Sequence, residues 1–349
     1  MRRPVDAARS LIANSGGVHS MIIRIACAAL LTIASISSYA DEDFDPFPTS
    51  DRSPFAQIYG LPALEGPRLL PPSKYSVRLT YEAANHFIAS SSEQEFLFLD
   101  GETHRTTLAV HYGTAFGEWG IEMPYVSHSG GFMDSFIENW HSTFGFPNGG
   151  RELFPRNQIS YLYQRRGVDR VQLTQSTDGM GDVQLLGGWR LPSGKTRWDT
   201  ALRASLKLPT GDASTLTGSG AADVAVWLTA GCALAYCPPK VRWNFSGGLL
   251  AVGRGDVLPE LQRRAAAFGG ATLGWQIWQP LVLKAEFLFH TPFYRGSDLR
   301  LLQATPAQLL LGGTVKLGSS TAFDVAIAED INVRTAPDVT LVVNLRTSF

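Results

Sequence analysis

The C-terminal segment of the chain alternates apolar and polar side chains and ends on an aromatic residue. Between Asp338 and Phe349, one set of alternate positions is mainly apolar, and the other carries Asn344, Arg346 and Ser348. Successive side chains of a β-strand point to opposite faces, so each set would occupy its own face of a sheet. This pattern is typical of a strand that lies between an apolar surrounding and a polar interior.

The same alternation recurs along the chain. Segments of about ten residues with this pattern are separated by turns, as expected for the strands of a membrane barrel. The clearest are residues 75–82, 198–208, 241–249 and 281–290. After residue 40, no segment is apolar over the roughly 20 residues that a membrane-spanning helix needs. We therefore predict an all-β fold, a transmembrane antiparallel β-barrel.

Short and long connections alternate between these segments, which indicates short periplasmic turns and longer outer loops. The short turns include Thr114–Ala115 and Arg165–Asp169, and the longest connection is 129–155. Counting back from the C-terminus gives about 14 strands, with both termini periplasmic. Twelve is the alternative, because residues 159–174 alternate weakly and residues 94–112 could form one long strand.

The N-terminus has the organisation of an export signal. Arg24 supplies a positive charge, residues 25–36 form an apolar run, and Ser38 and Ala40 are small residues placed for cleavage. The run is too short to span a bilayer as a retained anchor, which needs about 20 residues. We predict that residues 1–40 are a signal peptide that is removed on export.

The start codon could be Met1 or Met21, since the first twenty residues resemble an overlong leader. Residues 41–74 are rich in proline and too broken for a regular element, so they form either a periplasmic tail or a plug inside the lumen. Residues 75–349 would form the barrel. The formal net charge of −1 gives no support to nucleic-acid binding, which normally requires a basic surface.

Three cysteines are present in the chain. Cys27 lies in the apolar run and would be lost on cleavage. Cys232 and Cys237 are close enough in sequence to form a short disulfide in an oxidising compartment. Two unpaired thiols are the alternative; a metal site is disfavoured because no histidine or acidic pair accompanies them.

Several stretches resemble an uncharacterised family of Gram-negative outer-membrane barrels, described only as a domain of unknown function. They are Asp100–Arg105 (DGETHR), Ser129–Arg151, Gly181–Leu185 (GDVQL) and Leu206–Val224 (LKLPTGDASTLTGSGAADV). The last of them is also similar to loops of hydrocarbon-pathway outer-membrane channels. A final strand that ends in Phe349 resembles the signal read by the outer-membrane assembly machinery. The resemblance implies a barrel in the cell outer membrane and supplies no catalytic residues.

Charged and histidine side chains on the polar faces of the strands would line the lumen. The candidates are Arg78, Glu82, Arg105, Glu122, His128, Asp199, Arg203, Lys207, Arg242, Lys284, Glu286, Asp324 and Arg346. In an open pore such groups set selectivity. Because both signs occur, they could instead pair with one another and fill a narrow barrel.

The long connection after residue 129 contains apolar residues at helical spacing. A helix here could fold inward as a constriction, or it could cap the barrel mouth or lie at the lipid surface. The residues that would form the constriction are Phe132, Asp134, Phe136, Glu138, Trp140 and His141.

These features favour a channel for passive uptake or passage of small or moderately hydrophobic molecules, without cofactor or metal. The alternative is a closed structural or interaction barrel that binds lipopolysaccharide or a partner. The expected partners are outer-membrane lipid, lipopolysaccharide, the barrel-assembly machinery and a small-molecule substrate. A lipid-acting enzyme is disfavoured, because Ser127 and Ser129 point away from His128 on a regular strand and no GxSxG motif is present.

Overall fold

The computed structural model describes residues 42–144, 155–192, 197–232, 236–238 and 240–349. The expected signal peptide lies outside the described residues. In the described part, fifteen strands form one antiparallel sheet, and three of them (β4, β5 and β6) lie outside a closed ring of twelve. Among the described residues, no helix has the length and apolar character needed to cross a membrane.

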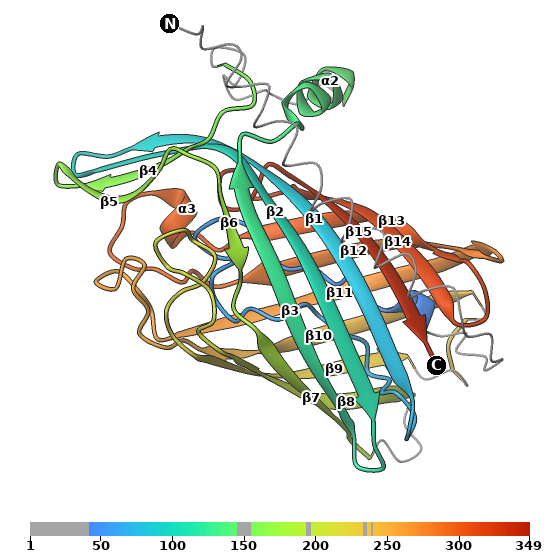
Figure 1. Ribbon diagram of the computed structural model, residues 1–349. Coiled ribbons are helices and arrows are strands. Elements are labelled where there is room, and N and C mark those ends of the chain that lie inside the picture. The colour runs from blue at the N-terminus through green and yellow to red at the C-terminus, as the bar shows by residue number, and fades with distance from the viewer. Residues whose placement is uncertain (1–41, 145–154, 193–196, 233–235, 239) are drawn as a thin grey trace, which may run out of the picture. The chain divides into compact units, whose positions relative to one another are not determined.

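The ring closes because β1 pairs with β2 on one side and with β15, the last strand, on the other (Figure 1). Its strands are β1 (Tyr75–Ser91), β2 (Glu95–Gly113), β3 (Glu118–Ser129), β7 (Gln184–Arg190), β8 (Trp198–Lys207), β9 (Asp223–Cys232), β10 (Val241–Ala251), β11 (Ala265–Trp278), β12 (Leu281–His290), β13 (Ala307–Lys316), β14 (Thr321–Asp330) and β15 (Val339–Ser348). The prediction of an all-β antiparallel barrel is confirmed.

The two faces of the ring differ as the alternation predicts. Leu228, Leu249, Leu273 and Leu311, on β9, β10, β11 and β13, point outward and are 50–66% exposed. Inward positions of the same strands are mostly buried and often polar. An exposed apolar exterior around a polar interior is the surface that a bilayer requires of a barrel.

The expected count of 14 strands is wrong, and the alternative of twelve is confirmed. The hairpin of β4 (Ser160–Arg165) and β5 (Val168–Leu173) pairs with the start of β2, from Glu95 to Asp100, which also pairs with the end of β1. It therefore extends the sheet beside the β1–β2 hairpin, beyond the ring, instead of adding two strands to the ring. The short strand β6 (Thr177–Met180) pairs with β3 beside β7.

The described part of the helix α2 (Asp134–Phe144) lies against the outside of the barrel, which corresponds to the alternative of a helix at the outer surface and not to the inward constriction. Ile137 is fully buried against Ala83 of β1 and Val339 of β15. These two residues are in register with the outward-facing set of their strands, which includes the exposed Leu79. The apolar edge of the helix thus finds its partners on the outer wall.

A carboxylate on the outer wall holds the start of α2. Glu102 Oε1 accepts hydrogen bonds from the backbone amides of Phe132 (2.9 Å) and Met133 (2.5 Å). The Asp134 carboxylate accepts a hydrogen bond from the Asn85 amide at 3.2 Å. Phe132 is 61% exposed and Phe136 48% exposed; Glu138 is half-buried, and the side chains of Trp140 and His141 lie outside the described residues.

Candidate functional site

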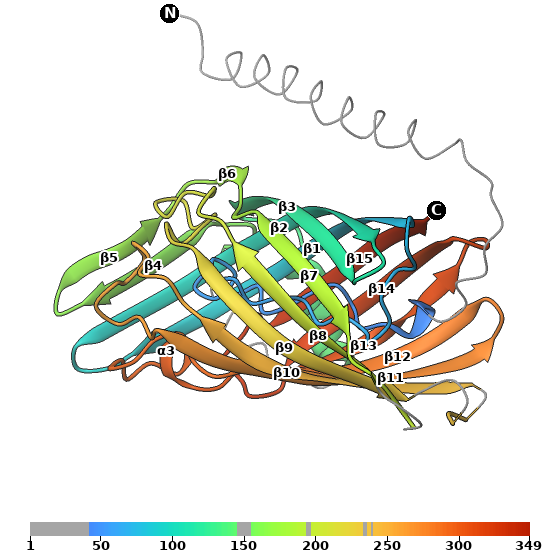
Figure 2. The ribbon, with the colours of Figure 1, turned by 90° about the horizontal axis from the view of Figure 1, so that it is seen from below.

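The segment 42–72 lies inside the ring and is the central feature of the lumen (Figures 1 and 2). It starts with the short helix η1 (Glu42–Phe44), near Lys316 at the end of β13. It turns at residues 53–59 near the opposite end of the barrel, where Phe55 packs on Tyr294. It then returns to Leu70, which is bound by Glu118 at the start of β3. The segment thus forms a first limb (residues 42–52) and a return limb (residues 60–72), which are joined by an apex (residues 53–59).

Charged wall residues bind the first limb. Each pair joins a residue of the limb to an inward-facing residue of β1 or β12, and all six residues are buried. The pairs are the Phe47 amide with Glu286 Oε2 (2.8 Å), Arg52 Nε with Glu82 Oε1 (2.6 Å) and Asp51 Oδ2 with His290 Nε2 (3.0 Å). Because buried charges are costly unless they are paired, these contacts fix the limb in register with the wall.

The apex is apolar and aromatic. Phe55 lies edge-on to Tyr163 and Tyr294, with ring centroids 6.4 Å apart in both cases. Tyr59 packs on Phe293 with the centroids 4.6 Å apart. Such aromatic pairs contribute packing beyond the area they bury. The apolar contacts of the segment are therefore concentrated at this end of the barrel, where β4 and the loop after β12 cover it.

The return limb is held by Glu65. Its carboxylate lies 2.7 Å from Arg78 Nη2 of β1 and 2.6 Å from Arg203 Nη1 of β8. Arg203 also donates to the backbone carbonyl of Gly66 at 2.8 Å. Two guanidinium groups on strands separated by β2, β3 and β7 thus converge on one carboxylate of the segment.

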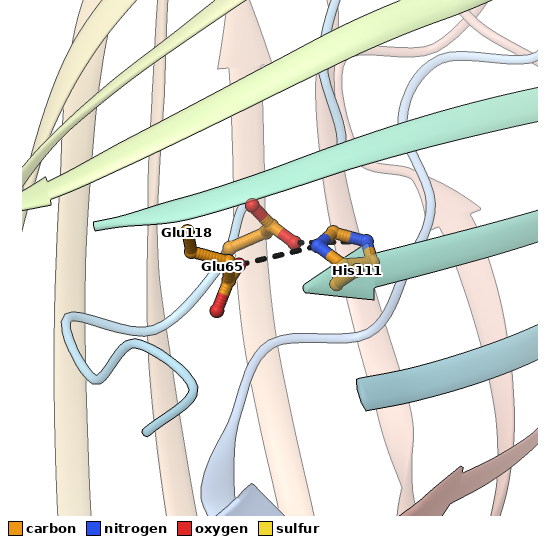
Figure 3. A group of neighbouring side chains, drawn as sticks. All are labelled: Glu65, His111 and Glu118. Atoms are coloured by element: carbon orange, nitrogen blue, oxygen red, sulfur yellow. Dashed lines mark hydrogen bonds and ion pairs between the residues drawn. The ribbon is translucent and has the colours of Figure 1, made fainter. Parts of the chain in front are cut away.

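Glu65, His111 and Glu118 form a cluster whose possible ligand atoms lie within 4.8 Å of one another (Figure 3). His111 Nδ1 lies 3.2 Å from Glu118, and Arg203 Nη1 lies 3.3 Å from the same carboxylate. Arg78 Nη2 lies 2.6 Å from His111 Nε2. Because both carboxylates already face guanidinium groups, the positive charge that a metal ion would supply is present, and we interpret the cluster as an ion-pair network.

Lys207 of β8 fixes the segment near its apex. Its Nζ lies 2.5 Å from Asp182, 3.2 Å from Asp223 and 2.9 Å from the carbonyl oxygen of Ile58, to which it donates. Asp223 in turn accepts a hydrogen bond from the Gly60 amide at 2.8 Å. A Cβ at position 60 would lie 3.0 Å from the Asp223 Cβ, so a glycine allows this close approach.

Small cavities lie between the segment and the wall. Their volumes are about 50, 20 and 10 Å³. The first and last share Pro48 and Arg78, and Leu64 lines both the first and the second. A water molecule needs roughly 10–15 Å³, so these cavities have room for a few waters but not for a solute.

The sequence matches, over residues 22–349, the family described as protein of unknown function (DUF3187). The chain belongs to this family. The resemblance inferred from the sequence segments is therefore confirmed for the family, whose description assigns no activity. No curated protein matches the sequence significantly.

Solved structures with a similar fold are outer-membrane barrels. The COG4313 outer-membrane channel from Pseudomonas putida F1 has a TM-score of 0.51 and 10% identity, over 80% of this chain and 97% of that one. The KdgM porin has a TM-score of 0.41 and 8% identity, over 78% and 99% of the two chains. The toluene transporter TbuX from Ralstonia pickettii has a TM-score of 0.38 and 11% identity, over 89% and 100%. At these identities the likeness to the Pseudomonas channel concerns the fold alone.

In this DUF3187 protein, the strand register places every predicted lumen residue on the inward face. Most of them contact the segment or a residue that binds it. The contacts not yet given are Arg105 with Gln57 (3.5 Å), His128 with Gln57 (3.4 Å), Arg242 with the Phe44 ring (5.4 Å), Lys284 with the Asp45 carbonyl (2.9 Å) and Arg346 with Asp43 (3.5 Å). Asp324 pairs with Lys284 at 3.1 Å, Glu122 lies 3.9 Å from Arg78, and Asp199 is half-buried near the start of β8.

Sequence reasoning missed the charged residues of the segment itself, above all Asp51, Arg52 and Glu65. Nothing in a proline-rich stretch indicates which distant strands it meets. It also missed Glu118 and His111 on the wall. These two are in phase with the predicted residues Glu122 and Arg105 of their strands, so the alternation could have found them.

His128 does not pair with either of the serines beside it in the sequence, Ser127 and Ser129. The His128 side chain points inward, and its ring nitrogens lie 3.0 Å from Thr103 Oγ1 and 3.2 Å from the Leu216 carbonyl oxygen. Ser127 and Ser129 belong to the opposite face of β3, as the alternation predicts. The cysteines Cys232 and Cys237 form a disulfide between β9 and the turn that follows it.

Proposed function

We propose that this DUF3187 protein is a channel of the outer membrane for the passive passage of small or moderately hydrophobic molecules, and that the segment 42–72 closes it in the state described. The proposal places the protein in the outer membrane because its exterior is apolar and its interior polar. The observation that carries the proposal is the occupation of the lumen by this segment, which leaves the three water-sized cavities described above between segment and wall.

The contacts of the segment suit a gate better than a permanent filling. Besides the apolar contacts of Phe47, Leu61 and Leu64, ion pairs and hydrogen bonds such as Arg52–Glu82 and Glu65–Arg203 hold its two limbs. When a limb moves away, water can solvate these groups, so displacement costs less than the opening of a dry apolar core. A segment that withdraws from the lumen stays attached to the barrel, because the chain continues through Lys74 into β1.

A closed structural or interaction barrel is the second candidate, because a filled lumen is equally compatible with it. In that case the segment is a permanent part of the fold, and the outer loops would bind lipopolysaccharide or a partner. The two candidates differ in one observable property: a channel conducts ions once the segment is removed, whereas a structural barrel without it is expected to misfold or to stay silent.

Single-channel conductance in a planar bilayer tests the proposal. We expect rare openings of the full mature chain and steady openings of a variant that lacks residues 42–72. A matched control lacks residues 132–144, which contain α2 on the outer wall; its conductance should equal that of the full chain. Heat-modifiable migration on gels shows whether each variant is folded. A folded but silent variant without residues 42–72 contradicts the channel.

The double variant Leu64→Cys/Gly270→Cys provides a test that leaves the segment in place. A Cβ at Gly270 would lie 2.6 Å from Leu64 Cδ1 and 2.4 Å from the Phe287 carbonyl oxygen, so the two positions are neighbours, and heat-modifiable migration must first show that the double variant folds. We expect openings to disappear in the oxidised protein and to return with reductant, while reductant leaves the wild type unchanged. Openings that persist in the cross-linked protein contradict a gating role for the return limb.

A further inference from the structure

Around Glu65, the residues of the barrel wall alone, without those of the segment, carry more positive than negative charges. The wall residues that line the 50 Å³ cavity beside it include four cations, Arg78, Arg203, Lys284 and Arg346, and two carboxylates, Glu118 and Asp324. The segment adds Asp45, Glu65 and Arg68 to the same cavity. Its acids therefore lie where the wall has a surplus of positive charge.

Arg78 and Arg203 depend on the segment more than Lys284 does. Lys284 has a partner on the wall, Asp324, at 3.1 Å. Arg78 has Glu65 at 2.7 Å, whereas its wall carboxylate, Glu122, is 3.9 Å away. Arg203 likewise has Glu65 at 2.6 Å and Glu118 at 3.3 Å. When Glu65 leaves, both guanidinium groups lose their closest anion.

We propose that Arg78 and Arg203 form a carboxylate-binding site in the open lumen and that Glu65 occupies this site as an internal substitute while the channel is closed. This inference rests on the proposed channel function and names its substrate class, small carboxylates. Guanidinium groups present paired donors that match a carboxylate, and here they approach it from two strands. His111, within 3.9 Å of Glu65, lies at the edge of the same site.

Competition for this site couples the substrate to the gate. A carboxylate that binds Arg78 and Arg203 only when Glu65 has left stabilises the open state by its differential affinity for that state. Free carboxylate on either side of the membrane should therefore increase the open probability, whereas a neutral molecule of the same size should not. Beside Arg78 and Arg203 the open lumen should also favour anions, because the local surplus of positive charge that lines this cavity then lacks the carboxylates of the segment.

The test combines open probability with reversal potential. In the full mature chain, we expect potassium acetate to raise the open probability relative to potassium chloride, and acetamide to have no effect. Glu65→Gln should open more often and respond less to acetate. Glu93→Gln removes the same charge at an exposed position of the β1–β2 turn and should behave as the wild type. In a salt gradient, the open state of Glu65→Gln should reverse near the anion equilibrium potential.

The variant Arg78→Gln/Arg203→Gln should lose the anion preference and the response to acetate. If it does not fold, the reversal potential of the chain without residues 42–72 tests the same wall. A pore that conducts without the segment but prefers cations, or an acetate response equal in Glu65→Gln and Glu93→Gln, overturns the carboxylate site and leaves the channel intact. A folded chain that stays silent without the segment refutes the channel itself.

Discussion

Truncation of Phe55 should release the apex of the segment. The side chain is 2% exposed and lies between the rings of Tyr163 and Tyr294. Removal of a buried phenylalanine side chain costs about 3–5 kcal/mol in a core that cannot collapse. Because every 1.4 kcal/mol is tenfold, the released fraction should rise by roughly two to three and a half orders of magnitude. This is an upper estimate, since the released segment keeps some of its contacts with the wall.

The assay is the single-channel open probability of Phe55→Ala beside Phe116→Ala. Phe116 lies in the turn between β2 and β3 and is 89% exposed, so the same truncation there removes no packing. We expect frequent openings only in Phe55→Ala, together with faster protease cleavage within residues 42–72. The reasoning is refuted if the two variants open equally while the chain without the segment conducts.

Three further predictions concern parts of the structure away from the apex. Ile137→Ala should weaken the packing of α2 on the outer wall by about 2–5 kcal/mol, so protease should cleave the helix faster. Phe136→Ala, at a half-exposed position, should not speed cleavage, and neither variant should alter conductance. Lys207→Met leaves Asp182 and Asp223 without their cation and should lower the stability of the barrel by about 3–5 kcal/mol. Its heat-modifiable migration should therefore be lost at a lower temperature than that of the control Lys240→Met, at an exposed position. Cys232→Ser/Cys237→Ser opens a loop with a sequence separation of 5 and should lower stability by about 2 kcal/mol, with conductance unchanged.

The barrel and its inward face were predictable because alternation is a local property of the sequence. Once a strand is placed, the identity of a residue and its parity decide its face, as for Arg203 and Lys207 on β8. No knowledge of the neighbouring strand is needed. This is why the predicted lumen residues lie on one face even though the strand count was too high.

The strand count required information that alternation does not carry. Residues of β4 alternate, but β4 and β5 are 6 residues long. Both are shorter than the roughly nine residues that a strand needs to cross the bilayer, but β7, a strand of the ring, has only 7, so length alone does not separate them. The apolar set of β4, Tyr161 and Tyr163, is fully buried in the cluster around Phe55. An apolar face shows that a strand is covered, but not whether lipid or protein covers it.

The helix after β3 illustrates the same limit. The helical spacing of apolar residues correctly predicts α2, but it does not predict whether the helix packs on the inner or the outer side of the barrel wall. The outer wall binds it because Glu102, an outward-facing carboxylate near the end of the barrel, accepts two backbone amides from the start of the helix. Charge on the lipid-facing set of a strand is costly in a bilayer, so an unexpected carboxylate there is a signal that something covers it.

A charged group of the lumen can be assigned a structural role when its partner lies on the wall, and a role toward a solute when its partner lies on the segment. The pair Lys284–Asp324 joins two wall strands, so neither partner belongs to the segment. Arg78 and Arg203 share a carboxylate that belongs to the segment, so their electrostatic environment changes when it moves. Substitution of Asp324 by Asn should therefore lower the stability of the barrel with and without residues 42–72. Glu65→Gln, by contrast, can change only the balance between the closed and open states, because in the open lumen Glu65 no longer contacts the wall.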